Sequence, residues 1–181
     1  MNGISYEGIV SPIALRKAYL CFLGPPGAGK TTLAKALAGK LKGDYFSTST
    51  FLRSLSSQNP KSEESIHIGQ AMAVGQNIEM HSIYGKILEA IDALQSDLNV
   101  IDGFPRTSEA MRELRRHILE SGHLVIFHVF TDVETCRSQF YSKGPDNTEA
   151  VFSQRLKAYT ELERPMLSSF GASIPIIDIR T

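Results

Sequence analysis

The sequence predicts an α/β fold, a three-layer α/β/α arrangement in which helices cover both faces of a five-stranded parallel sheet. Three observations lead to this class. An apolar run at 18–23 passes through a glycine-rich loop into a helix-forming run at 33–41. Further short apolar runs then alternate with helical periodicity, and one of them, 98–102, ends on an acid. Strands separated by helices in this way form doubly wound parallel sheets.

Length and composition favour one domain without a nucleic-acid or membrane partner. A chain of 181 residues buries roughly 70% of the surface of its unfolded form. Nineteen basic residues balance nineteen acidic ones, so no overall field attracts polyanions. The apolar runs are shorter than the ~18 residues of a membrane span, and Cys21 and Cys136 form no Cys-x-x-Cys pair. We therefore expect a cytoplasmic monomer.

The glycine-rich loop is the segment on which the functional prediction depends. It fits the phosphate-loop pattern of Gly, four residues, Gly, Lys and Thr. Its residues are Gly24, Pro25, Pro26, Gly27, Ala28, Gly29, Lys30, Thr31 and Thr32. The glycines permit backbone conformations in which successive N–H groups turn toward an anion, and the helix N-terminus adds partial positive charge. Lys30 is expected to reach the β- and γ-phosphates of a nucleotide, and the Thr31 hydroxyl to bind Mg²⁺.

Helix and strand signals follow the loop. Apolar residues within 33–41 recur at helical spacing, and Gly43 follows in a C-cap position. The apolar pair 45–46 predicts the second strand, and 47–50 caps a helix that carries Arg53. Because this helix begins at the C-terminal edge of the sheet, Arg53 faces either a ligand or solvent.

The stretch 56–99 contains no strand signal before its last residues. Helical periodicity recurs at 66–74 and at 78–94, separated by Gly75. A helical insert of this length between two strands of one sheet, bounded at 48–95, is typical of a small mobile subdomain that covers a site.

The third strand ends on Asp102 in the manner of a Walker-B element, and this carboxylate is expected to orient Mg²⁺ directly or through water. The next residue is Gly103, where a hydrolysing ATPase of the motor type would place a Glu to activate water. A guanine-reading Asn-Lys-x-Asp is also absent from the sequence. Transfer to a bound acceptor is therefore favoured over hydrolysis or a GTP switch. Pro105 forces a turn that presents Arg106 just past the strand end.

Two more strands are predicted in the second half of the chain. The apolar run at 124–130, interrupted only by His128, is typical of a parallel strand buried on both faces. There a lone His is a satisfied core or strand-end group. The last strand is predicted at 174–179. The five histidines form no His-x-x-x-His pair, so no zinc ligands are predicted.

The helices of this half carry two arginines. One helix is predicted at 133–141 and bears Arg137, and another at 148–163, ended by Pro165. Arg155 falls within the apolar stripe of the second helix. A guanidinium on an inward face needs an anion, either a structural carboxylate or a ligand phosphate.

At this point two motifs resemble those of adenylate kinases, within the nucleoside monophosphate kinase family. They are the loop 24–32 and Asp-Gly-Phe-Pro-Arg-Thr at 102–107, and the similarity extends over about 18–179. It implies a phosphotransferase that moves the γ-phosphoryl of ATP to a nucleoside monophosphate, most simply AMP, with Mg²⁺ as cofactor. Positioning and charge neutralisation would account for most of the rate enhancement, because phosphoryl transfer requires little covalent chemistry from the protein.

The resemblance also implies a division of the chain and roles for single residues. A kinase domain, 18–181, would follow an N-terminal extension, 1–17, and contain an acceptor-binding insert, 48–95, and a short lid, 138–147. Loop residues 24–32 would bind ATP. Residues implied for the acceptor are Thr48, Arg53, Met72, Gly75, Ile78, Gly103 and Arg106. Implied catalytic cations are Lys30, Arg106, Arg137 and Arg155, and implied metal ligands are Thr31 and Asp102.

Several positions depart from the family pattern. Thr31 stands where adenylate kinases usually have Gly, which would give Mg²⁺ a direct protein ligand, and Lys143 replaces a lid arginine. The adenine-reading Gln corresponds to Ala110, with Glu109 beside it, so UMP, CMP and deoxynucleotides stay open as acceptors. The last strand lacks a following helix, so the donor adenine is expected to pack more weakly or against another chain. A catalytically weak, regulatory nucleotide-binding module is the alternative function.

Overall fold

The computed structural model describes residues 16–78, 81–118 and 122–181. Five parallel strands form one sheet in the order β2-β3-β1-β4-β5. Their bounds are Lys17–Leu23 (β1), Asp44–Ser47 (β2), Leu98–Asp102 (β3), Gly122–Phe130 (β4) and Ile176–Arg180 (β5). The helical segments are α1 (Lys30–Leu41), α2 (Thr48–Gln58), α3 (Glu63–Val74), α4 (His81–Asp92), α5 (Ser108–Ile118), α6 (Val133–Tyr141), α7 (Glu149–Ala158), a π-helix η1 (Tyr159–Glu163) and α8 (Arg164–Phe170).

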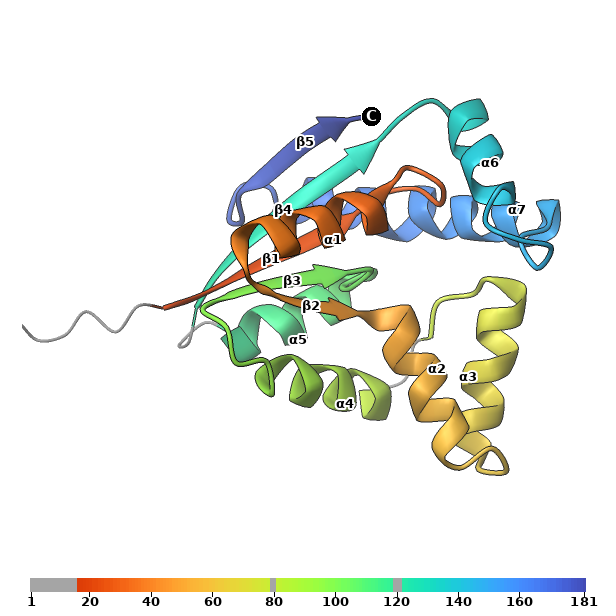
Figure 1. Cartoon of the computed structure of the whole chain (residues 1–181), viewed down its shortest axis with the longest axis horizontal. Helices are drawn as coiled ribbons and strands as arrows, with labels where there is room; N and C mark the ends of the chain where they lie inside the picture. The colour runs from red at the N-terminus through yellow and green to blue at the C-terminus, as the bar shows by residue number, and fades with distance from the viewer. Residues whose placement is uncertain (1–15, 79–80, 119–121) are drawn as a thin grey trace, which may run out of the picture.

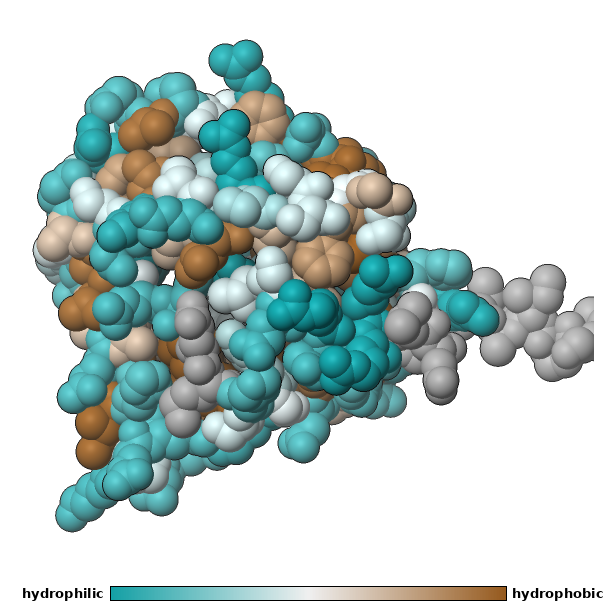
Figure 2. All heavy atoms as spheres, turned by 180° about the vertical axis from the view of Figure 1, so that it is seen from behind, coloured by the Kyte–Doolittle hydropathy of each residue, from teal (hydrophilic) through white to brown (hydrophobic). Residues whose placement is uncertain are grey.

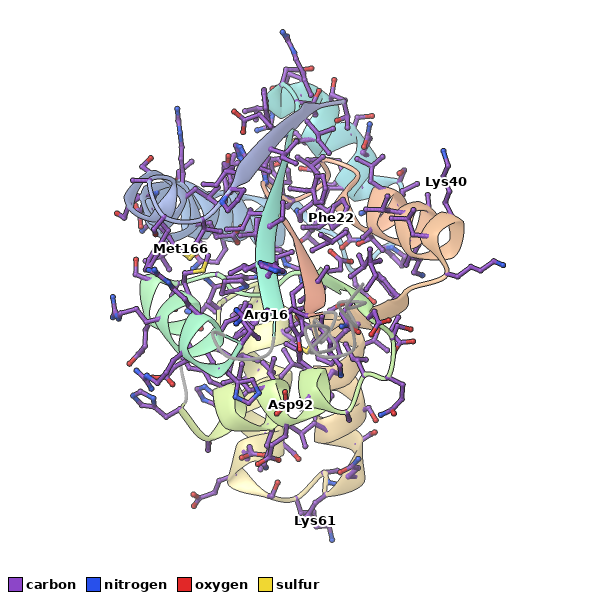
Figure 3. All side chains as sticks on the ribbon, turned by 90° about the vertical axis from the view of Figure 1, so that its left-hand side faces the viewer. Arg16, Phe22, Lys40, Lys61, Asp92 and Met166 are labelled. Atoms are coloured by element: carbon purple, nitrogen blue, oxygen red, sulfur yellow. The ribbon has the colours of Figure 1, made fainter. Side chains whose placement is uncertain are left out.

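The central strand β1 separates two hydrophobic cores. Phe22 packs with Ala38 of α1 on one face of the sheet, whereas Cys21 and Leu23 pack on the other face with Met166 of α8. Figure 3 shows Phe22 on the side of α1 and Met166 on the opposite side. Because successive side chains of a strand point to opposite faces and both faces are covered, β1 reads as a continuous apolar run. The predicted three-layer α/β/α class is confirmed.

Parallel pairing brings the motifs to one edge of the sheet. Phe22 of β1 and Ser47 of β2 both lie opposite Asp102 of β3. The loop after β1, the start of α2 and the turn after β3 therefore meet at the carboxyl ends of the strands, toward which the arrowheads in Figure 1 point. This is the edge at which open α/β sheets bind ligands.

Three helices, α2, α3 and α4, lie between β2 and β3 in the chain. The helix predicted at 66–74 begins earlier, at Glu63, because the Ser62 side chain caps it by accepting a hydrogen bond from the Ser65 backbone N–H. In Figure 1, α2 and α3 extend beyond the carboxyl edge of the sheet. That residues 48–95 move as one subdomain stays a prediction.

The helix end predicted at Pro165 is wrong. Pro165 does not end the helical segment, because α7 passes through η1 directly into α8. Pro165 occupies the first turn of α8, where a missing N–H is tolerated. The preceding π turn, which has i→i+5 hydrogen bonding, supplies the interruption of α-helical bonding that a proline requires. This turn buries both Tyr159 and Glu163.

The ends of the described chain differ slightly from the predictions. Most of the predicted extension 1–17 lies outside the described residues, and β1 begins at Lys17. The last strand is Ile176–Arg180 rather than 174–179, because Pro175 has no N–H to donate to the sheet. Within the described ranges, no helix is both long and apolar enough to cross a membrane.

Candidate active site

The loop 24–32 curves tightly between β1 and α1. Gly24, Gly27 and Gly29 have φ angles of 138°, 84° and 82°, which L side chains rarely adopt. A Cβ at Gly24 would also lie 1.9 Å from the carbonyl oxygen of Val129, and one at Gly27 would lie 1.9 Å from that of Cys136. The first two glycines are therefore needed for close packing against β4 and α6 as well as for the curvature of the loop.

Lys30 folds back over this loop. Its ammonium donates hydrogen bonds to the carbonyl oxygens of Gly24 and Pro25, each at 2.6 Å. Burial lowers the pKa of Lys30 from 10.5 to about 8, although the nearby carboxylate of Glu163 acts in the opposite direction. An anion in the loop would favour the charged ammonium, so Lys30 is suited to bind phosphate.

Asp102 accepts hydrogen bonds from residues of three elements. Its Oδ2 accepts from the hydroxyl of Thr31 at 2.7 Å and from the hydroxyl of Tyr45 at 2.9 Å, and its backbone oxygen accepts from Thr48 Oγ1 at 3.1 Å. Burial and the charge of Asp102 raise the pKa of Tyr45, so the phenol stays a donor. Thr31 and Asp102 thus lie together as the sequence predicts, whereas Tyr45 is an addition that sequence reasoning missed.

A cavity of about 480 Å³ opens at this edge of the sheet. It is lined by many of the predicted site residues: Gly24, Pro26, Gly27, Lys30, Thr31, Thr32, Thr48, Arg53, Met72, Gly75, Ile78, Asp102, Gly103, Arg106 and Arg155. Three loop residues, Pro25, Ala28 and Gly29, are outside this lining, as is Arg137. The two sequence motifs and the helices after β2 therefore face one common space.

Gly103 makes room for Arg106. The Arg106 Nε donates to the carbonyl oxygen of Gly103 at 2.9 Å, and Gly103 has a φ of 85°. A Cβ at Gly103 would lie 2.9 Å from Arg106 Nη2. The glycine that argued against water activation in the sequence therefore also allows the guanidinium to lie across the end of β3.

Arg155 reaches the same cavity from α7. Its guanidinium carbon lies 5.6 Å from the centre of the Phe140 ring, and burial lowers its pKa, with the charges of Arg106 and Arg53 adding to the effect. In the part of the chain that the structure describes, Arg155 forms no ion pair with a carboxylate. Of the two anions that the sequence left open, a ligand phosphate is therefore favoured.

Comparisons with known proteins agree with this geometry. The adenylate kinase family model matches residues 22–174. The chain belongs to the adenylate kinase family. An adenylate kinase of Helicobacter pylori (strain Shi470) is 28% identical over 152 residues, which cover 80% of this chain and 78% of the relative. One of Prochlorococcus marinus (strain MIT 9211) is 29% identical over 159 residues, 85% and 83% of the two chains. One of Nautilia profundicola is 28% identical over 172 residues, 91% and 88%.

This membership confirms the resemblance found in the sequence and the prediction of a nucleoside monophosphate kinase. Each relative named above is covered over more than two thirds of its length. The shared region spans the phosphate loop, the turn at 102–107 and the end of η1. The cavity lies within it.

Arg137 does not face the cavity in this member of the adenylate kinase family. Its Nη1 donates to Glu134 at 2.7 Å, its Nε lies 3.3 Å from Glu149, and its guanidinium carbon lies 5.3 Å from the centre of the Phe152 ring. Two carboxylates thus already hold this arginine, and the structure gives no support to the predicted contact with a phosphoryl group. Lys143 lines the cavity instead.

Glu163 is the second functional candidate that sequence reasoning missed. It ends η1, is 5% exposed and lines the cavity. Its Oε1 lies 3.9 Å from Arg106 Nε. Burial raises the pKa of Glu163, while Arg106, Lys30 and a hydrogen bond from the backbone N–H of Gly24 oppose the rise. In the sequence, Glu163 lies four residues after Tyr159, which is buried, and this helical spacing was the signal that could have placed Glu163 on the inward face.

Proposed function

We propose that this chain transfers the γ-phosphoryl group of ATP to AMP and so produces two ADP. The observation that carries the proposal is the convergence of positive charge on one cavity. Its basic lining residues are Lys30, Arg53, Arg106, Lys143 and Arg155. They come from the phosphate loop, α2, the turn after β3, the segment before α7, and α7 itself. One triphosphate and one monophosphate carry the negative charge that such a lining would neutralise.

Mg²⁺ fits the oxygen donors at the floor of this cavity. The hydroxyl of Thr31 and the carboxylate of Asp102 lie side by side, and Mg²⁺ prefers oxygen ligands. When bound with ATP, the ion neutralises charge on the β- and γ-phosphates. Thr31 and Asp102 would hold it directly or through water, and Tyr45 keeps the Asp102 carboxylate in place through its hydrogen bond.

The remaining residues of the site position the two substrates. We assign the phosphate loop to ATP, and Arg53 and Arg106 to the acceptor phosphate. Buried apolar side chains of Leu52, Ile83 and Ala110 line the same cavity and offer a wall for the acceptor base. We assign the transferring group to Arg155, which lies in α7, and to Lys143, which precedes α7, because both line the cavity. No protein group needs to form a covalent bond in this reaction.

We also propose a monomer in a reducing cytoplasm. Cys21 and Cys136 are buried free thiols, as proteins of reducing compartments have. On the face drawn in Figure 2, exposed hydrophobic residues are scattered among hydrophilic ones, without the broad apolar area of an obligate interface.

A compound of two adenosines joined by five phosphates tests the proposal. It spans both sites at once, so its second nucleoside binds without a separate association cost, and we expect it to bind more tightly than ATP or AMP. Calorimetry with Mg²⁺ would compare it with the adenosine–uridine version, and a coupled assay would measure turnover of a panel of monophosphates. No advantage over ATP would leave only the nucleotide-binding module. Preference for the mixed compound would identify UMP as the acceptor.

A further inference from the structure

The cavity contains a buried acid among its cations. Apart from Asp102, which accepts hydrogen bonds from Thr31 and Tyr45, Glu163 is the acidic side chain in the described lining. It is 5% exposed, so solvent does little to stabilise its charge. A buried carboxylate is stable only with positive partners. Lys30 and Arg106 are the cations that act most strongly on it.

We propose that Glu163 is an internal counter-ion, which holds Arg106 and Lys30 in the nucleotide-free cavity and competes with substrate phosphates for them. This inference rests on the proposed function, because it concerns the same phosphate site. Glu163 is a positioning residue here, acting on the substrate through the two cations. The residue thereby limits how tightly ATP and ADP bind and favours the release of product.

The contacts of Glu163 resemble those of a bound anion. Its Oε1 lies 3.9 Å from Arg106 Nε, and the nearby backbone N–H of Gly24, the first residue of the phosphate loop, lowers the pKa of its carboxyl, as a donor to a carboxylate does. Lysine, arginine and loop N–H groups are also the donors that bind phosphate oxygens. A phosphate that enters the cavity therefore meets cations whose charge already acts on a carboxylate.

The π turn keeps Glu163 in this position. Tyr159, at the start of the turn, is buried, and its hydroxyl lies 2.7 Å from His128 Nε2. Glu163 and Arg155 are eight residues apart in sequence, yet both line the cavity. Because π turns are rare and occur often at functional sites, this local structure supports a role for the buried acid beyond packing.

The negative charge of Glu163 should weaken the binding of phosphate. A negative charge a few ångströms from a phosphate repels it, and the repulsion is stronger in a partly buried cavity than in water. Glu163→Gln removes this charge but keeps the shape of the side chain and an oxygen that can accept from Gly24. We therefore expect the substitution to strengthen phosphate binding about tenfold, with no gain for a ligand that lacks phosphate.

Calorimetry on the full chain tests the proposal. The variants are Glu163→Gln and the control Glu161→Gln, which removes the same charge from an exposed position in the same π turn. The probes are ATP, inorganic tripolyphosphate and adenosine, each without and with Mg²⁺. We expect both ATP and tripolyphosphate to bind Glu163→Gln about tenfold more tightly than wild type, and adenosine to bind both proteins equally. Glu161→Gln should match wild type throughout.

The other outcomes separate this inference from the proposed function. Wild-type protein that binds neither ATP nor tripolyphosphate would refute the proposed function itself. Wild-type binding with no gain, or a loss, in Glu163→Gln would overturn the counter-ion role alone. An equal gain in Glu161→Gln would attribute the effect to net charge and would also overturn it. A gain for adenosine would indicate a change in the fold, which thermal unfolding of the variant would reveal independently.

Discussion

The hydroxyl of Thr31 donates a 2.7 Å hydrogen bond to Oδ2 of Asp102, although the two residues are 71 positions apart in the chain. Pairing of β1 with β3 creates this contact, because it places Phe22 opposite Asp102 and the phosphate loop follows directly. Tyr45 donates to the same oxygen from β2. Hydroxyl groups from two segments thus fix one carboxylate at the point where Mg²⁺ is proposed to bind.

Thr31→Ala should raise the Mg²⁺ concentration needed for half-maximal ATP binding several-fold, because it removes the proposed oxygen ligand and a hydrogen bond to Asp102. Thr31→Ser retains the hydroxyl and should behave like wild type. Calorimetric titrations of ATP at a series of Mg²⁺ concentrations would measure the midpoint. If Thr31→Ala and Thr31→Ser had the same midpoint as wild type, the hydroxyl would have no part in metal binding.

Lys30→Met should nearly abolish transfer in a folded protein. The lysine neutralises phosphate charge, so we expect a loss on the order of 3 kcal/mol of transition-state stabilisation. At neutral pH the variant should stay folded, because the lowered pKa of Lys30 means that folding disfavours its charged form, which offsets the loss of its hydrogen bonds to Gly24 and Pro25. Steady-state kinetics and thermal unfolding would measure the two effects.

Lys40→Met is the matched control for this variant. Lys40 lies in the last turn of the same helix, α1, and is exposed. Figure 3 shows its side chain extending away from the sheet. The Lys40→Met variant should keep wild-type kcat. A Lys30→Met protein that retained more than about a tenth of wild-type kcat, a loss below ~1.4 kcal/mol, would show that the loop is not the catalytic centre.

Arg155→Ala should lower kcat far more than Arg137→Ala does. Arg155 lines the cavity without a carboxylate partner among the described residues, so its removal should cost on the order of 100-fold, as for a preorganised donor. Arg137 is engaged by Glu134 and Glu149, so Arg137→Ala should change kcat by less than about tenfold. Equal losses in the two variants would restore the role that the sequence motif assigned to Arg137.

The parts of this molecule that could be predicted from sequence are those with local signals. The loop 24–32 and the turn at 102–107 have fixed spacings that specify a backbone conformation, and β1 and β3 are apolar runs of strand length. Each of these signals lies within a few consecutive residues. These signals suffice to predict the fold class. They also suffice to predict that the phosphate loop and Asp102 contribute to one site at the carboxyl edge of the sheet.

The features that were missed depend on contacts between distant segments. Tyr45 reaches Asp102 only because β2 pairs with β3, and a two-residue apolar signal does not reveal that register. Glu163 faces the cavity because a π turn replaces an α turn, a choice that tertiary packing makes. Arg137 lies outside the cavity lining because its partners are Glu134, on its own helix, and Glu149, beyond the following loop; its predicted role in transfer stays a prediction.

Because Glu163 is buried, its ionisation should make the free energy of unfolding depend on pH. Burial raises the pKa of this carboxyl above 4.5, against the opposing effects of Arg106, Lys30, the Gly24 N–H and His128. A carboxyl with a raised pKa in the folded state stabilises folding when protonated, and this stabilisation is lost as the pH rises through the folded-state pKa. We therefore expect ionisation of this group to lower the stability of wild type as the pH rises above 4.5.

The glutamine side chain of the Glu163→Gln variant cannot ionise, so the variant does not lose stability from this position as the pH rises. We expect the Tm of the variant minus that of wild type to increase as the pH is raised from 4.5 to neutrality. Thermal unfolding by circular dichroism across this range would measure the difference, with Glu161→Gln as the control that should show no such trend, since its carboxyl is exposed. A difference that stayed constant or decreased with rising pH would mean that Lys30 and Arg106 outweigh burial, because the pKa of Glu163 would then not be raised by folding.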